Sequence, residues 1–141
     1  MLTVTLAESF QDRARVFVIR GAVFVAEQQV PIEEEWDRHD LDADHFLALA
    51  DGAPVGTGRL VVAGAEGILG RLAVLPKARG TGAGAALVRA IERRGAERGL
   101  RAVELHAQTH AIGFYERLGY TAYGAEFLDA GIPHRHMRRD L

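Results

Sequence analysis

The segment that most constrains this fold runs from Leu72 to about Arg94, where a strand-like stretch ends at a proline and a glycine-rich turn leads directly into a helix. Three glycines in the turn lack side chains where backbone N–H groups would approach a ligand. The N-terminus of the following helix adds unpaired donors and about half a positive charge. Arg79 supplies a further positive charge, so the segment predicts a pyrophosphate-binding turn. A connection shaped by packing alone is the alternative.

Two other phosphate-binding motifs fit this turn poorly. Four residues, from Pro76 to Arg79, separate the strand from the first glycine, and the turn lies in the middle of the chain, which disfavours a Rossmann dinucleotide site. A Walker A loop needs a Gly-Lys-Ser/Thr tripeptide, and the chain contains none. We therefore do not expect nucleotide hydrolysis.

Hydrophobic periodicity predicts alternating strands and helices around this turn. Ser9 is a candidate N-cap for a helix running to about Glu27, with Phe10, Phe17 and Phe24 on one face and the arginines, including Arg20, elsewhere. The expected strands are residues 2–6, 45–50, 54–64, 67–75, 102–108, 120–124 and 134–141, and the later helices are residues 81–98 and 110–119. The predicted order is β-α-(α)-β-β-β-α-β-α-β-β, and an additional short helix or loop holds the acidic segment after Pro31.

Composition bounds the protein class. The 141 residues are 48% hydrophobic and 26% charged, and no linker or repeat divides them, which predicts a single globular domain over residues 1–141. The net charge of −2 disfavours nucleic-acid binding. The absence of cysteine excludes disulfides, thiolate metal sites and a cysteine nucleophile. Charges interrupt every apolar stretch, so we expect no membrane segment and a cytoplasmic protein.

The pattern V-x-P-x-x-R-G-x-G-x-G, at residues 74–84, resembles the acyl-CoA-binding motif of the GNAT N-acetyltransferase superfamily. Residues 107–120 (AQTHAIGFYERLGY) are similar to the second motif of that family, with Gln108 where Asn is usual. Within the superfamily, residues 23–31, 107–108 and 126–137 are similar to the small ElaA-type branch. The resemblance implies an α/β (α+β) fold with a mixed, mostly antiparallel central sheet flanked by helices.

The resemblance also implies a site and a donor, acetyl-CoA. The strand ending at Val74 would splay from residues 103–107, and backbone amides near Ala73 and Val74 would hold the pantetheine and polarise the thioester carbonyl. Tyr115 would protonate the departing CoA thiolate, although its spacing alone fits a core aromatic beside Phe114. The residues expected to contact the cofactor are Ala73, Val74, Arg79, Gly80, Thr81, Gly82, Ala83, Gly84 and Gln108.

The implied acceptor is an amine of a small molecule or a peptide, and an amine must be neutral to attack. For a lysine-like amine at pH 7, deprotonation costs about 4.6 kcal/mol, so a general base or a water relay should assist. Glu27 is the leading candidate because that helix end borders the acceptor side in the resembling fold. Glu104, His106, His134 and a water relay remain open.

The acidic segment between residues 33 and 44 is first interpreted as a solvated face that could also attract a cationic acceptor. Its Asp40-x-Asp42-x-Asp44 spacing matches the start of a calcium loop, but His45 replaces the required glycine. His106 and His110 straddle a strand-to-helix turn and lack a zinc-protease glutamate, so no metal site is predicted.

Two functional hypotheses follow. The first is an acetyl-CoA-dependent N-acetyltransferase acting by direct attack in a ternary complex, since no cysteine could carry an acyl group. The second is a non-catalytic acyl-CoA-binding or regulatory module, favoured by the missing Asn of the second motif. A homodimer through residues 137–141 is also an open possibility.

Overall fold

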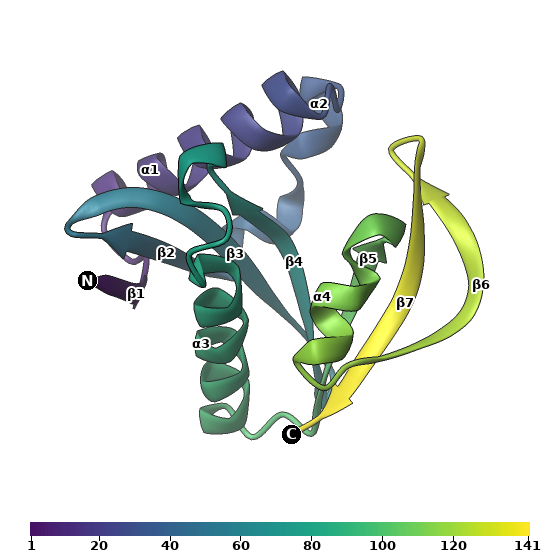
Figure 1. Cartoon of the computed structure of the whole chain (residues 1–141). Helices are drawn as coiled ribbons and strands as arrows, with labels where there is room; N and C mark the ends of the chain where they lie inside the picture. The colour runs from purple at the N-terminus through teal and green to yellow at the C-terminus, as the bar shows by residue number, and fades with distance from the viewer.

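Seven strands form one sheet in the order β1-β2-β3-β4-β5-β7-β6, and the computed structural model describes all of residues 1–141 (Figure 1). The strands are β1 (Leu2–Leu6), β2 (Asp44–Ala50), β3 (Ala53–Ala63), β4 (Glu66–Val74), β5 (Ala102–Gln108), β6 (Thr121–Asp129) and β7 (Ile132–Asp140). Every neighbouring pair is antiparallel except β4 with β5. The predicted mixed, mostly antiparallel sheet is confirmed.

Helices cover both faces of the sheet. They are α1 (Phe10–Arg20), the π-helical turn η1 (Gly21–Glu27), α2 (Ile32–Glu35), α3 (Ala83–Glu97) and α4 (Ile112–Arg117), with 3-10 turns η2 (Arg38–Leu41), η3 (Pro76–Ala78) and η4 (Thr109–Ala111). Leu47 of β2 belongs to the hydrophobic cluster under α1, whereas its neighbours Phe46 and Ala48 belong to the cluster under α3. Because successive strand residues point to opposite faces, α1 and α3 lie on opposite sides of the sheet (Figure 1).

The predicted order of elements is confirmed, and most boundaries agree within two residues. Ser9 caps α1 as expected, its hydroxyl accepting a hydrogen bond from the Asp12 N–H at 3.1 Å. The helix predicted to continue to Glu27 changes to π-helical geometry after Arg20. Such wide turns frequently occur at functional sites, and this one ends beside the glycine-rich turn.

The predicted buried face of α1 is wrong. Val16, Ile19 and Val23 face the sheet, whereas Phe10 is 83% exposed. Arg20, expected on the outside, is completely buried. Its neighbours in space, described with the site below, explain how a charge is accommodated there.

The only parallel pair, β4 and β5, separates part-way along its length and leaves a gap in the middle of the sheet. β4 and β5 are hydrogen-bonded from the Glu66–Ala102 pair to the Leu69–Leu105 pair, and no pairing continues beyond it. β5 instead remains paired with β7 up to Gln108 and His134. Figure 1 shows the two strands together at their lower end and separating toward α2 and the tip of the β6–β7 hairpin. The predicted splay therefore lies at the carboxyl ends of β4 and β5.

The C-terminal strand lies inside the sheet. β7 is paired with β5 on one side and with β6 on the other, and Met137 is completely buried. Residues 137 and 138 are thus paired on both sides, whereas residues 139 and 140 are paired with β5 alone. The strands with a free edge along their whole length are β1 and β6, which are the sites open to strand pairing in a dimer. None of the helices combines the length and the apolar character needed to cross a membrane.

Candidate functional site

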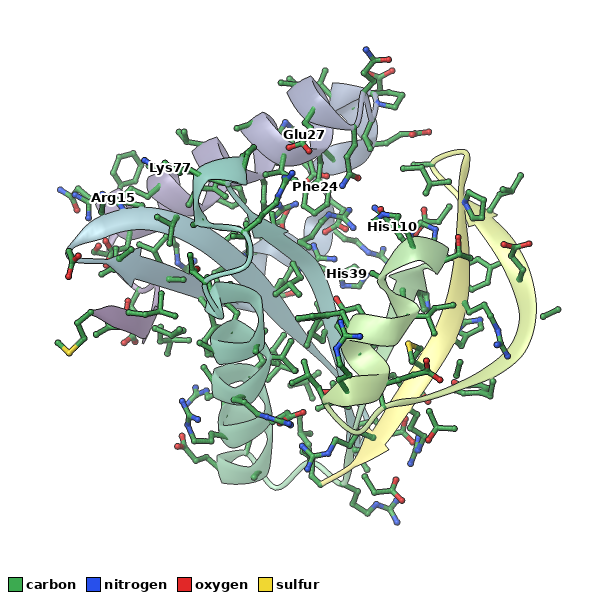
Figure 2. The ribbon with its side chains drawn as sticks, viewed as in Figure 1. Arg15, Phe24, Glu27, His39, Lys77 and His110 are labelled. Atoms are coloured by element: carbon green, nitrogen blue, oxygen red, sulfur yellow. The ribbon has the colours of Figure 1, made fainter.

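A cleft of about 790 Å³ occupies the gap between β4 and β5. Its walls come from elements far apart in the chain: η1, α2, η2, β3, residues 68–72 of β4, the end of β5, η4, α4, and the β6–β7 turn with the start of β7. Figure 2 shows Phe24, His39 and His110 around this gap, each from a different element. Such a mixed polar and apolar hollow at a break in a sheet is the preferred place for a ligand.

The glycine-rich turn and the start of α3 lie next to Phe114, one of the residues that line the cleft. Gly80 and Gly82 have φ angles of 79° and 90°, which other residues rarely adopt, and a Cβ at either position would meet nothing within 4 Å. The first helical hydrogen bond runs from the Ala86 N–H to the Gly82 carbonyl, so three N–H groups before Ala86 have no acceptor in the helix. The turn therefore presents open space and free donors, which suits a phosphate group.

Gly84 allows three elements to meet at this point. A Cβ on Gly84 would lie 3.2 Å from Cζ of Phe114 in α4 and 3.9 Å from Cγ2 of Val74 in β4. The start of α3 thus packs directly against the cleft-lining Phe114 and the last residue of β4. This close approach joins the glycine-rich turn to the splayed strands.

Of the two β4 amides predicted to contact a pantetheine, only that of Val74 faces the gap. The Leu75 N–H donates to the Val55 carbonyl of β3 at 2.8 Å, and Ala73 lies two residues earlier, opposite Thr57. Alternation along a strand therefore directs the Ala73 N–H toward β3 and the Val74 N–H toward the side that β5 has left. The register therefore favours the Val74 amide over the Ala73 amide as a contact for a pantetheine.

Arg79 and Glu27, predicted to serve different substrates, bind each other. Nη1 and Nη2 of Arg79 donate to the two carboxylate oxygens of Glu27 at 2.7 and 2.6 Å, and Nε donates to the Val74 carbonyl at 3.0 Å. The hydrogen bonds from Arg79 lower the pKa of Glu27, and Glu27 is not among the residues that line the cleft. The geometry does not favour the prediction that Glu27 is the general base, because a carboxylate held by arginine is a weaker base.

Tyr115 serves both as a core residue and as a wall of the cleft. Its ring packs edge-on against Phe114 and Tyr120, with centroid distances of 4.9 and 5.9 Å, and only 7% of the residue is exposed. Burial raises the pKa of Tyr115 well above its ordinary value of 10. No protein group hydrogen-bonds its hydroxyl, so the phenol remains protonated and free to donate to a ligand.

Gln108 closes a polar chain across the mouth of the cleft. Its Nε2 donates to Oε1 of Gln28 at 2.9 Å, and its Oε1 accepts from Nε2 of His110 at 2.7 Å. The side chain therefore links η1 to η4 over 80 residues of sequence, a contact that its role in the second motif did not predict.

The remaining candidates for the general base, Glu104, His106 and His134, differ in their hydrogen bonds and in whether they line the cleft. Glu104 accepts a 2.6 Å hydrogen bond from the Tyr123 hydroxyl and also contacts Arg138 at 3.3 Å, and it does not line the cleft. His106 lies at the cleft wall, where burial and the nearby His136 lower its pKa. His134 lines the cleft and donates through Nδ1 to a backbone carbonyl.

Sequence analysis missed a buried charge network behind the cleft. Arg20 donates to Glu35 at 2.7 Å and to Asp40 at 2.6 Å, and its guanidinium stacks over the Phe17 and Trp36 rings. The other members of the network are Arg59, Arg71 and Asp37, all joined through N···O distances of 3.4 Å or less. Three residues of the acidic segment are thus neutralised by buried arginines rather than solvated, and Asp44 is likewise held by Arg94 and Arg98 at 2.9 Å.

The network shifts its carboxyl groups in opposite directions. Burial raises the pKa of Glu35 more than its arginine partners lower it. For Asp40 burial acts in the same sense, but hydrogen bonds from Arg20, Arg59 and the Asp37 N–H outweigh it and lower the pKa to about 2. Arg71, with a left-handed φ of 52° at a bulge in β4, is anchored to the Glu35 carbonyl and to Asp37. The network therefore holds the bulge of β4 in place through the contacts of Arg71 with Glu35 and Asp37.

Comparison with known proteins gives consistent matches over the whole chain. A family model described as an acetyltransferase (GNAT) domain matches residues 10–141. YjcF of Bacillus subtilis (strain 168), named an uncharacterized N-acetyltransferase, is 37% identical over 140 residues, which are 99% of this chain and 100% of the relative. A solved acyl-CoA N-acyltransferase from Pseudomonas aeruginosa is 30% identical with a TM-score of 0.85, covering 99% of this chain and 98% of the other. Escherichia coli ElaA is 26% identical with a TM-score of 0.87, covering 99% of each chain.

Proposed function

Because this chain belongs to the GNAT acetyltransferase family, we propose that it transfers an acetyl group from acetyl-CoA to a primary amine by direct attack in a ternary complex. Family membership supports acyl transfer and an acyl-CoA donor. The acetyl group, the amine acceptor and the order of chemical steps are our proposal. The observation that carries it is the open gap between β4 and β5 beside the unpaired N-terminus of α3.

The donor would lie between the glycine-rich turn and the end of β4. Its pyrophosphate fits the open space at Gly80 and Gly82 and the free N–H groups at the start of α3, with Thr81, Ala83 and Gly84 completing the turn. Arg79 is close enough to the turn to supply positive charge once it leaves Glu27. The pantetheine arm would run past Phe114 toward the cleft, because Gly84 brings that ring against the helix start.

The thioester would sit where β4 and β5 separate. The Val74 N–H points into that gap without a strand partner, and it would donate to the thioester carbonyl as negative charge develops on the oxygen. One well-placed donor of this kind contributes about 3 kcal/mol to a transition state. Gln108 borders the same gap from β5 and holds η1 against it.

Tyr115 would act on the leaving group. Its protonated hydroxyl lies in the cleft wall without a protein partner, so it is available to donate its proton toward the CoA sulfur as the carbon–sulfur bond breaks. The nucleophile is the acceptor itself, since the chain contains no cysteine that could carry the acetyl group as a thioester. The acceptor would enter from the side formed by η1, α2 and the β6–β7 turn.

The first test separates a donor-binding site from a simple connection. Calorimetry with acetyl-CoA, using NAD and ATP as controls, should show saturable binding of acetyl-CoA alone. An Arg79→Ala plus Gly82→Val double variant should abolish it, because valine cannot adopt a φ of 90° without strain. A folded protein that binds no acetyl-CoA would refute the proposed function.

The second test separates an enzyme from a non-catalytic acyl-CoA-binding module. CoA release is followed with spermidine, glucosamine and a peptide with a free N-terminus as acceptor probes. Amine-dependent release, reduced at least about 100-fold in Tyr115→Phe with an acetyl-CoA Kd within twofold of wild type, would support both the activity and the role of the phenol. Binding without release for any amine would favour the module, and full turnover by Tyr115→Phe would remove that residue as the acid.

A further inference from the structure

His134 differs from the other polar groups of the cleft because its burial, its hydrogen bond and its stacked neighbour fix the position and the tautomer of its ring. It lies near the start of β7, directly opposite Gln108, where β5 has already left β4. The residue is only 8% exposed, yet its side chain lines the cleft together with Tyr115. A nearly buried imidazole thus borders the space assigned above to the reacting groups.

One hydrogen bond determines which ring nitrogen carries the proton. Nδ1 of His134 lies 2.6 Å from the carbonyl oxygen of Ile132. A carbonyl can only accept, so Nδ1 must be the protonated atom and Nε2 keeps its lone pair. The backbone therefore holds the neutral ring in the tautomer that a general base requires on its Nε2 side.

The lone pair on Nε2 is unused and accessible. No protein group hydrogen-bonds Nε2 of His134. Only two buried side-chain atoms lack a hydrogen-bond partner, Nδ1 of His45 and Nε of Arg59, so Nε2 of His134 is in contact with solvent. Phe127 stacks on the ring at a centroid distance of 5.9 Å and an interplanar angle of 25°, which limits its rotation. A fixed ring with a free basic atom at a cleft wall is positioned to accept a proton from a bound molecule.

The other candidates lack this combination. The carboxylate of Glu27 is held by Arg79, and that of Glu104 is held by Tyr123 and Arg138. The His106 ring packs edge-on against Phe127 and His136, with no hydrogen bond that selects one of its tautomers.

The titratable groups around His134 come from four elements. They are His106 of β5, His110 of η4, Asp129 at the end of β6 and His136 of β7. Asp129, which lines the cleft, is an exposed carboxylate.

We propose that His134 is the general base of the transfer reaction, an inference that rests on the proposed function. As the acceptor nitrogen forms its bond to the acetyl carbonyl carbon, Nε2 of His134 takes the proton which that nitrogen loses. The carbon–sulfur bond then breaks, and the sulfur receives the proton of Tyr115. Exchange with water returns His134 to its neutral form and restores the proton of Tyr115, so one proton leaves nitrogen and one reaches sulfur.

The decisive variant is His134→Asn, whose side-chain amide can still donate to the Ile132 carbonyl but offers no basic nitrogen. We expect kcat with the best of the three amine probes to fall at least about 100-fold at pH 7, while the acetyl-CoA Kd stays within twofold. The acid limb of the wild-type pH–rate profile should disappear in the variant. His136→Asn is the matched control, because this residue lies two positions along on the same strand and does not line the cleft.

A second measurement does not depend on activity. Nitrogen-15 NMR of histidine-labelled protein should show neutral His134 with its proton on Nδ1 and with Nε2 unprotonated. A proton on Nε2 would overturn the inference in any case. Normal turnover and an unchanged pH profile in His134→Asn would overturn the role of His134 alone, whereas a wild-type protein that releases no CoA with any amine would overturn the proposed function and the role together.

Discussion

Replacing Arg20 by alanine should destabilise the protein far more than its place on a surface helix suggests. The side chain is completely buried and donates hydrogen bonds to the carboxylates of Glu35 and Asp40 and to the Glu35 carbonyl, at 2.6 to 3.3 Å. Removing it leaves two carboxylates in a poorly solvated site. Breaking a buried ion pair in this way costs about 3–5 kcal/mol.

The lower end of that range applies here. Asp40 keeps Arg59 at 2.9 Å and Glu35 keeps Arg71 at 3.4 Å, so neither carboxylate is left without a cation. We therefore expect the free energy of unfolding to fall by about 3 kcal/mol at pH 7, measured by urea denaturation. The loss should shrink as the pH is lowered toward 5, because burial already raises the pKa of Glu35 and this carboxylate can take up a proton more readily once Arg20 is gone.

Arg15→Ala is the matched control for this experiment. Arg15 lies on the same helix and also pairs with a carboxylate, Asp12 at 2.9 Å, but its side chain is 55% exposed. Exposed pairs contribute about 0–1 kcal/mol, so this variant should differ little from wild type. Equal and small losses for Arg15→Ala and Arg20→Ala would refute the view that the buried network holds the acidic segment in place.

Two further predictions concern the charged groups of the site. Asp40→Asn should lower stability by about 2 kcal/mol at pH 7; since the folded pKa of about 2 lies below the ordinary 3.8, that stability is present above about pH 4 and is lost as the pH falls toward 2. Unfolding free energies between pH 2 and 5 should thus decline less steeply in the variant, and an equally steep decline would contradict the assignment. Glu27→Gln should release Arg79 and lower the acetyl-CoA Kd by about two- to fivefold in calorimetry; weaker binding would show that Glu27 positions Arg79 for the donor instead.

The elements of the fold could be predicted because each depends on local pattern. Strands alternate with a period of two, and the helix after Gly82 shows an apolar stripe and a glycine start. The turn at residues 79–84 was recognisable for the same reason, since positive φ angles at Gly80 and Gly82 require a residue without a Cβ.

The side-chain partners could not be predicted in the same way. Phe10 was expected to be buried and is exposed, whereas Arg20 was expected to be exposed and is buried. The burial of Arg20 depends on the carboxylates of Glu35 and Asp40, which lie 15 and 20 residues later in the chain. The sequence around Glu27 suggested a free carboxylate, but in the fold Glu27 binds Arg79, which lies 52 positions away in the chain. No periodicity within either segment carries information about such a partner.

The sequence by itself therefore determined the order of strands and helices, the family and the glycine-rich turn at residues 79–84, since all of these depend on contiguous residues. Only the tertiary structure decided which charges are neutralised, which β4 amide faces the gap and which histidine nitrogen is free. These properties arise where β4 and β5 separate and where segments distant in the chain meet, and a proton or an ion pair responds to the groups around it in space rather than to its neighbours in sequence.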